Sequence, residues 1–210
     1  MFIKTLSPPT RKMFDKIQGL PWIAKSYLAG GTALALHFGH RISNDLDFFI
    51  NDDFKTSLIR NELSKLGPFR VTDEKENTLV GSWPKVKLSL MKYPYKLLEK
   101  TVLLKEVPIA SVTDITLMKL DAVSARGTKR DFVDLFWVSK HSGQPLIDYV
   151  RLMRKKFGKD YSVVHLIKSL CYFLDADREP MPKMLKKLTW EEVKSYFIFQ
   201  SMELARRFIM

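Results

Sequence analysis

Two aspartates separated by a single residue, Asp45 and Asp47, are the side chains of this sequence best suited to metal chemistry. The apolar residues Leu46 and Phe48 alternate with them. Alternate side chains of a β-strand share a face, so both carboxylates would project to one side while the apolar residues enter the core. Neighbouring carboxylates repel each other unless a cation lies between them, and Mg²⁺ prefers such oxygens together with water and substrate phosphates. The spacing therefore predicts a Mg²⁺ site at Asp45 and Asp47.

A glycine pair upstream of these aspartates is suited to binding phosphate. The segment 28–32 reads Leu-Ala-Gly-Gly-Thr. Gly30 and Gly31 allow close backbone approach, the N–H groups at a helix start attract anions, and Thr32 adds a hydroxyl donor. A lone Gly-Gly pair is usually a turn, and a lone Asp-x-Asp pair is usually solvated. Their combination in this order predicts a triphosphate site beside the metal site.

The spacing of apolar residues predicts the elements that would position these side chains. Helices are expected at 10–19, 32–38 and 54–66, and strands at 26–29, 45–50, 69–74, 77–83 and 85–92, with short apolar pieces at 102–104 and 107–110. From residue 111 the spacing becomes helical, with helices expected at 111–126, 130–140, 145–157, 162–174 and 190–207. The sequence therefore predicts an α+β front half followed by a helical rear half.

Two blocks of the sequence carry a family resemblance. The first runs from Gly30 to Phe49 and contains the Gly-Gly-Thr and Asp-Leu-Asp-Phe segments; the second comprises residues 114–122 around Lys119 and residues 126–135 around Lys-Arg-Asp-Phe-Val-Asp. In this order they resemble the motifs of the AbiEii/AbiGii-type toxins, a family of the DNA polymerase β-like nucleotidyltransferase superfamily. The resemblance implies an α+β nucleotidyltransferase core, a mixed β-sheet flanked by helices, over residues 1–140. A helical C-terminal region would follow at 141–210.

The resemblance also implies roles for individual residues. It gives a catalytic set of Asp45, Asp47, Lys119 and Asp131, a nucleotide-binding set of Gly30, Gly31, Thr32 and Lys119, and a metal site at Asp45 and Asp47. Lys119 would reach the triphosphate as a compact point charge, and Asp131 would orient or deprotonate the acceptor, or position Lys119. Alternatively, Lys119 is an exposed helix lysine and Asp131 caps its helix. Asp134 is a further candidate, or it pairs with Arg130 on the helix surface.

Two features between and after these motifs leave alternatives open. His37, His40 and Arg41 either contact the nucleotide or lie on a loop or helix-end surface. In the wider superfamily a third carboxylate on a later strand completes the metal site, and Ser89 stands at the corresponding position here. Serine is a poor Mg²⁺ ligand beside a carboxylate. Either two acids suffice, with Asp131 supplying the base, or the activity is reduced or lost.

The charge of the chain favours an anionic partner. Its 210 residues carry 35 basic and 23 acidic side chains, a formal net charge of +12. Five basic residues, Arg151, Arg154, Lys155, Lys156 and Lys159, occur without an acid between them. They are predicted to follow an RNA backbone, and the resemblance makes tRNA the expected acceptor. The alternative is an ordinary solvated helix face.

Composition sets the expected class and location of the protein. With 46% hydrophobic and 28% charged residues it is an ordinary globular chain, without an apolar run long enough for a membrane span or the apolar core of a secretory signal. The single cysteine, Cys171, cannot form an internal disulfide and is expected to be a buried core thiol. We therefore expect a cytoplasmic protein without a membrane partner.

Three functions remain open from the sequence. The first is a Mg²⁺-dependent nucleotidyltransferase that transfers NMP from an NTP to tRNA or another RNA, as the toxin of a toxin–antitoxin or abortive-infection system; an antitoxin protein would then be a further partner. The second is an NTP- or RNA-binding module with this fold and little or no catalytic activity. The third is transfer to a small molecule or to a protein hydroxyl.

Overall fold

The computed structural model describes residues 1–209 and divides into two compact units, residues 1–111 and the residues from Val112 onward. In the sequence, the division falls after the last strand of the sheet, where the helical region begins. The domain boundary expected between residues 140 and 141 places the motifs at 114–122 and 126–135 in the nucleotidyltransferase core. That functional division of the chain stays a prediction.

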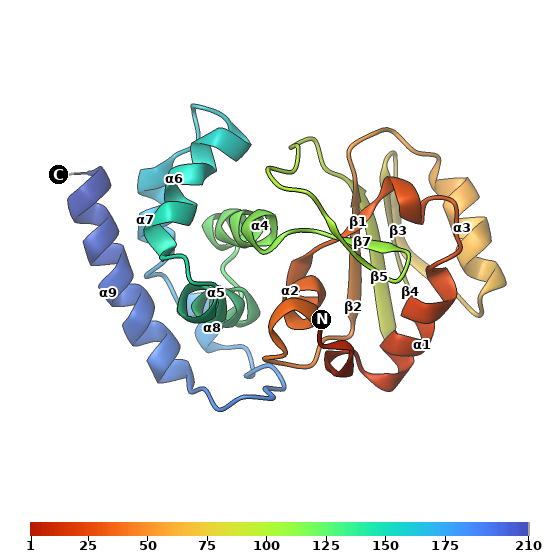
Figure 1. The fold of residues 1–210 in the computed structure, drawn as a ribbon, viewed down its shortest axis with the longest axis horizontal. Helices are drawn as coiled ribbons and strands as arrows, with labels where there is room; N and C mark the ends of the chain where they lie inside the picture. The colour runs from red at the N-terminus through yellow and green to blue at the C-terminus, as the bar shows by residue number, and fades with distance from the viewer. Residues whose placement is uncertain (210) are drawn as a thin grey trace. The chain divides into compact units, whose positions relative to one another are not determined.

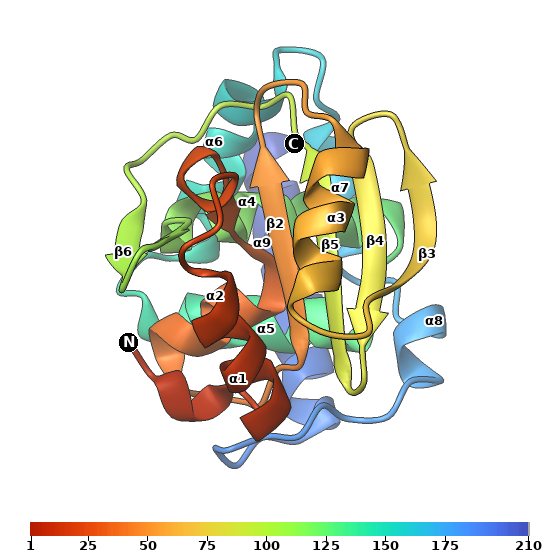
Figure 2. The same ribbon diagram turned by 90° about the vertical axis from the view of Figure 1, so that its right-hand side faces the viewer.

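A mixed β-sheet forms the centre of the first unit. Its strands are β1 (Tyr27–Leu28), β2 (Asp45–Ile50), β3 (Arg70–Lys75), β4 (Thr78–Trp83), β5 (Val86–Lys92), β6 (Val102–Leu104) and β7 (Val107–Ile109). They form a seven-stranded sheet in the order β3-β4-β5-β2-β1-β7-β6. Figure 2 shows β2, β5, β4 and β3 side by side in this sheet. The pairs β2–β5 and β1–β7 are parallel and the others antiparallel. The predicted α+β class with a mixed sheet is confirmed.

Helices cover both faces of this sheet. They are the 3₁₀ turns η1 (Ile3–Thr5) and η2 (Ile23–Lys25) and the α-helices α1 (Pro8–Ile17), α2 (Gly30–Phe38) and α3 (Thr56–Lys65). Helices α1 and α3 lie on one face and α2 on the other (Figure 1). The strand β2 shows the predicted alternation, because Leu46, Phe48 and Ile50 are buried while the residues between them are half-buried.

The second unit is helical. Its helices are α4 (Val112–Ala125), α5 (Lys129–His141), α6 (Leu146–Phe157), α7 (Val163–Ser169), α8 (Leu174–Asp177) and α9 (Trp190–Phe208). The ring of Phe132 on α5 packs against Phe173, Trp190 and Phe197, with ring centroids 5.1, 6.0 and 5.3 Å away. A cluster of aromatic rings therefore joins α5 to α9 and to the segment before α8.

The prediction of a single helix over 162–174 is wrong, and so is that of a buried thiol. Helix α7 ends at Ser169, and Cys171 lies in the turn that follows it, exposed to solvent. Its Sγ donates a hydrogen bond to the carbonyl oxygen of Lys168 at 3.2 Å. Because the chain has left the helix at this point, the apolar neighbours of Cys171 in sequence do not carry it into the core.

Among residues 1–209, no helix combines the length and apolar character that a membrane crossing requires.

Candidate active site

The strand β2 presents Asp45 and Asp47 on its half-buried face. The other face is buried by Leu46 and Phe48, and the Phe48 ring packs edge-on against Trp22, with centroids 5.2 Å apart. At the middle of the strand, the backbone N–H of Ala29 donates to the carbonyl oxygen of Asp47 at 2.9 Å. The buried face and these backbone bonds hold the strand, so the two carboxylates have a defined direction.

Ser89 lies directly beside Asp47. The parallel register of β2 and β5 pairs these two residues, and Ser89 Oγ donates a hydrogen bond to Oδ1 of Asp47 at 2.6 Å. Ser89 is only 4% exposed. The hydroxyl therefore orients the carboxylate from the position where a third acid was expected.

Gly30 lies close to the other oxygen of the same carboxylate. It has φ +66°, and a Cβ atom built on it would lie 2.9 Å from Oδ2 of Asp47. A side chain at this position would therefore meet both a strained backbone conformation and this carboxylate oxygen. The first glycine of the predicted phosphate motif is required for the close approach of α2 to Asp47.

Substituting Gly30 with alanine is expected to displace the Asp47 carboxylate. The left-handed backbone costs about 1–2 kcal/mol for a residue with a Cβ. Gly143 is a matched control because it also has a positive φ (+77°), while its added Cβ would meet no atom within 4 Å. In urea unfolding and in Mn²⁺ titration, both variants should lose stability but only Gly30→Ala should lose metal affinity. Equal metal affinity in the two variants would contradict this reading of Gly30.

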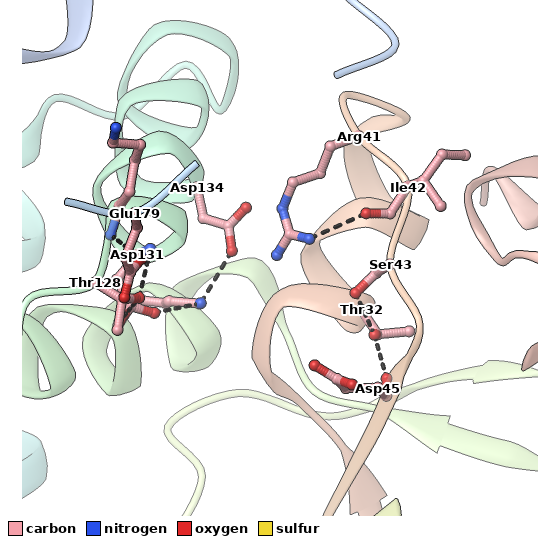
Figure 3. Close-up of polar contacts among 11 residues, drawn as sticks. Thr32, Arg41, Ile42, Ser43, Asp45, Thr128, Asp131, Asp134 and Glu179 are labelled. Carbon is pink, nitrogen blue, oxygen red and sulfur yellow. Dashed lines mark hydrogen bonds and ion pairs between the residues drawn. The ribbon is translucent and has the colours of Figure 1, made fainter. Parts of the chain in front are cut away.

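The Thr32 hydroxyl is used inside the protein. Thr32 is buried, and its Oγ1 is hydrogen-bonded to Ser43 Oγ at 2.7 Å and to the backbone carbonyl oxygen of Asp45 (Figure 3). These contacts tie the first turn of α2 to the start of β2. Sequence reasoning missed Ser43, since a lone serine in a connecting segment carries no signal of its partner.

The N-terminus of α2 supplies backbone donors next to the carboxylates. Its N-cap, Ala29, has an extended backbone and no side chain that caps the helix. The first N–H groups of an α-helix have no carbonyl partner within the helix, and the helix dipole makes this end positive. Because Gly30 lies close to the Asp47 carboxylate, these donors lie beside the face of β2 that carries Asp45 and Asp47. Backbone N–H donors and carboxylate oxygens thus occur together in one unit.

The donor set fits Mg²⁺ held jointly by protein and nucleotide. Residues 1–209 contain no group of three or more histidine, cysteine, aspartate or glutamate side chains placed to bind a metal. Mg²⁺ is commonly held by one or two carboxylates, with waters and substrate phosphates completing the octahedron. Asp45 and Asp47 match that pattern, and Ser89 orients one of them in the manner of an outer-shell partner.

The residues between the two parts of the first motif are largely inside the protein rather than on a surface loop. His40 and Arg41 are buried, and Arg41 donates to the carbonyl oxygen of Ile42 at 3.2 Å (Figure 3). His37 Nε2 lies 2.9 Å from the carbonyl oxygen of Ala110, to which it donates as the Nε2–H tautomer. Burial lowers the pKa of His37 below its ordinary value and outweighs this hydrogen bond.

In the second unit, Lys119 lies in a buried ionic cluster. Its ammonium contacts the carboxylates of Asp131 at 2.6 Å and Asp134 at 2.9 Å, and the three side chains are 10%, 5% and 0% exposed. Figure 3 shows both carboxylates with their dashed contacts. Lys119 is therefore not the exposed helix lysine of the alternative interpretation, and Asp134 is not on the helix surface.

Asp131 sits at the third position of α5, and Thr128 caps the helix. The Thr128 hydroxyl donates to Oδ2 of Asp131 at 2.6 Å and also accepts the backbone N–H of Asp131. The alternative that Asp131 itself is the N-cap is therefore wrong. Burial raises the pKa of the Asp131 carboxyl, but the Lys119 ammonium and the Thr128 hydroxyl together lower it below its ordinary value of 3.8.

The lowered pKa of Asp131 predicts a component of acid unfolding. Because the folded-state pKa lies below the unfolded one, this stabilisation is complete above about pH 4 and is lost as the pH falls through the folded-state pKa. Urea midpoints measured from about pH 6 to pH 3 should therefore decline more steeply for the wild type than for Asp131→Asn. Urea midpoints that decline equally with pH in the wild type and in Asp131→Asn would contradict the lowered pKa of Asp131.

Four of the five basic residues predicted to contact RNA are exposed. Arg151, Arg154 and Lys155 lie on α6, and Lys159 follows its end. Lys156 does not belong to this surface. Its side chain is 0% exposed and forms an ion pair of 2.7 Å with Asp114 of α4, which is also 0% exposed. Helical periodicity turns Lys156 inward, and the buried acid that receives it lies too far away in sequence to be recognised.

A mixed sheet that presents two carboxylates beside a glycine-rich helix N-terminus defines a protein of nucleotidyltransferase fold. Two structures from Helicobacter pylori share this fold. JHP933 has a TM-score of 0.57 at 18% identity, with 96% of this chain and 94% of that chain covered. A second structure, described as a nucleotidyltransferase, has a TM-score of 0.51 at 16% identity, with 96% of each chain covered.

Sequence comparison gives the family. Residues 13–101 match the model of the AbiEii nucleotidyltransferase toxins of type IV toxin–antitoxin systems. An uncharacterised protein of Aquifex aeolicus is 34% identical over 200 residues, which cover 93% of this chain and 95% of that protein. By this match, residues 13–101 belong to the AbiEii nucleotidyltransferase toxin family, and the relative from Aquifex aeolicus is similar over nearly the whole chain.

Proposed function

We propose that this protein transfers a nucleoside monophosphate from an NTP to an RNA acceptor, with tRNA as the substrate, in a Mg²⁺-dependent reaction. It would act in the cytoplasm as the toxin of a toxin–antitoxin pair. The observation that carries the proposal is the approach of Gly30, at the N-terminus of α2, to the Asp47 carboxylate. Phosphate donors and metal-binding oxygens are thereby held side by side by one strand and one helix.

In the first unit, one set of groups would bind the nucleotide phosphates and another would bind the metal ion. Backbone N–H groups of Gly31 and Thr32 would bind phosphoryl oxygens, because the first turn of a helix leaves such groups without intrahelical partners. The Thr32 hydroxyl would act by positioning β2, since it is bound to the carbonyl oxygen of Asp45. Asp45 and Asp47 would hold Mg²⁺, which when bound neutralises charge on the phosphates and the departing pyrophosphate.

In the proposed reaction, an acceptor hydroxyl oxygen attacks the α-phosphorus of the NTP. The bond from that phosphorus to the β-phosphate oxygen breaks, pyrophosphate leaves, and the hydroxyl proton passes to a base. On the family resemblance we propose Asp131 as that base or as an orienting group, and Lys119 as a cation for the triphosphate. The low pKa of Asp131 keeps it as a carboxylate near neutral pH.

The choice of RNA rests on charge. The chain carries +12, and the exposed residues Arg151, Arg154, Lys155 and Lys159 lie on or just after one helix. Such a surface favours a polyanion, and its binding should weaken steeply as salt rises. Transfer to a small molecule or to a protein hydroxyl would not require that salt dependence.

The direct test incubates the purified protein with total tRNA, Mg²⁺ and each labelled NTP in turn, beside reactions that contain a chelator. We expect label on RNA with one or more NTPs and none with the chelator. Label on the protein itself would favour a protein acceptor. Absence of transfer with every NTP, together with measurable NTP or RNA binding, would favour a binding module.

The binding module is retained as a second candidate because of Ser89. A neutral hydroxyl occupies the position beside Asp47 where a third carboxylate would complete the metal site. A module of this kind would keep affinity for nucleotide or RNA but have little turnover.

Substituting Ser89 with alanine is expected to weaken metal binding about tenfold, since loss of an outer-shell hydrogen bond costs 10- to 100-fold in metal affinity. Mn²⁺ titration by electron paramagnetic resonance measures the change without requiring turnover. Ser89→Thr retains a hydroxyl and should recover most of the affinity. Unchanged Mn²⁺ affinity in Ser89→Ala would show that the 2.6 Å hydrogen bond does not orient a metal ligand.

A further inference from the structure

A pocket of about 340 Å³ opens in the second unit where α4 and α7 end. The residues of this α4–α7 pocket that bear on binding are Ser124, Arg126, His165, Lys168, Tyr172 and Asp175. It is distinct from the exposed basic residues of α6. Its volume falls in the range of small-ligand pockets, roughly 300–1,000 Å³.

The side chains of Arg126 and Lys168 are not needed to cap the two helices. Basic residues commonly follow helix C-termini because they satisfy the last carbonyl groups. Here the backbone N–H of Arg126 donates to Ala122, and His165 Nε2 lies 3.0 Å from the carbonyl oxygen of Ser124. In α7, backbone N–H groups of the following turn donate to the carbonyl oxygens of residues 166, 168 and 169.

Arg126 and Lys168 therefore remain available for a ligand. Both are exposed, and neither forms an ion pair with the residues that the structure describes. The pocket contains one acid, Asp175, against these two basic side chains. The balance favours an anion, and guanidinium and ammonium groups are the usual protein partners of phosphate.

An aromatic surface lies in the same pocket. Tyr172 lines the pocket and is 55% exposed, so its ring is accessible to a ligand. Exposed aromatic rings beside basic side chains are the arrangement on which proteins stack unpaired bases while holding the adjoining phosphate.

We propose that the α4–α7 pocket binds one unpaired nucleotide of the acceptor RNA, with its phosphate at Arg126 and Lys168 and its base on Tyr172. The proposal rests on the proposed RNA acceptor and adds a second contact region to the basic residues of α6. The same chemistry is offered by a free mononucleotide, so the test includes both ligands.

The test measures fluorescence anisotropy of labelled tRNA and of a labelled mononucleotide over a range of salt. The variants are Tyr172→Ala, Tyr172→Phe and the pair Arg126→Ala/Lys168→Ala. The control pair Lys12→Ala/Lys65→Ala removes the same charge from exposed positions of α1 and α3. Loss of one stacked base should weaken tRNA binding about tenfold in Tyr172→Ala, and Tyr172→Phe should bind like the wild type.

Removing both cations should lower the salt dependence of log K for tRNA by about 0.7, the value for one single-stranded phosphate contact, and the control pair should not. Equal loss in the control pair, or unchanged binding by Tyr172→Ala, would overturn the pocket while NMP transfer to RNA still supported the proposed function. Mononucleotide binding that depends on Tyr172, without any effect on tRNA, would also overturn it. Failure of NMP transfer, with tRNA binding still sensitive to these variants, would overturn the proposed function and leave the pocket standing.

Discussion

Replacing Asp45 with asparagine is expected to reduce NMP transfer by on the order of 10³-fold or more. A metal ion contributes several kcal/mol to stabilising charge in such a reaction, and each 1.36 kcal/mol corresponds to a factor of ten in rate. Asparagine keeps the shape of the side chain and the half-buried face of β2, so the fold should be retained. The measurement is the rate of label transfer from NTP to RNA, with circular dichroism to check folding.

Asp52→Asn is the matched control for this prediction. Asp52 lies two residues after the end of β2 and is exposed, and its substitution removes the same charge from a nearby position. We expect its transfer rate to equal that of the wild type. A fully active Asp45→Asn enzyme, or a loss of equal size in Asp52→Asn, would rule out the assigned metal site.

Lys156 is expected to act on stability, and its neighbour Lys155 on RNA binding. Substituting Lys156 with methionine preserves the apolar stem but removes the ammonium that neutralises the fully buried Asp114 carboxylate. Breaking a buried ion pair from one side costs about 3–5 kcal/mol. Lys155→Met changes an exposed residue of the same helix and should alter the free energy of unfolding by less than about 0.5 kcal/mol.

Urea unfolding and RNA binding separate the two lysines. Lys156→Met should lower the urea midpoint strongly, whereas Lys155→Met should leave it unchanged and weaken RNA binding modestly. The double variant Asp114→Asn/Lys156→Met removes both charges and should recover part of the stability, because no buried carboxylate is left without its ammonium. A Lys156→Met protein as stable as Lys155→Met would contradict the role of the buried pair.

Local patterns in the sequence were sufficient to predict much of the first unit. The alternation Asp-Leu-Asp-Phe-Phe-Ile predicts a strand at 45–50, and β2 has these bounds because a half-buried strand must alternate polar and apolar side chains. The glycine pair likewise predicts a turn into a helix. Helix α2 begins at Gly30 itself rather than at Thr32, since a positive φ at Gly30 opens its first turn.

The candidate site was predicted only in part, because its fixing contacts join residues far apart in the chain. The order of the motifs indicated Asp45 and Asp47, but the parallel register that places Ser89 against Asp47 depends on how β5 aligns with β2. The bond between Thr32 and the backbone of Asp45 likewise follows from the packing of α2 on the sheet.

Residue spacing was enough to predict the α+β class, the most regular strand and the carboxylate pair, because each depends on neighbouring residues and on one backbone period. Which charged residues are buried depends instead on how the helices pack in three dimensions. Lys155 and Lys156 look alike in sequence, yet one is exposed and the other forms an ion pair with Asp114 inside the helical unit. A charged side chain is buried in a core only where an opposite charge lies beside it. For Lys156 that charge is Asp114, and the packing of α4 against α6 brings the two together.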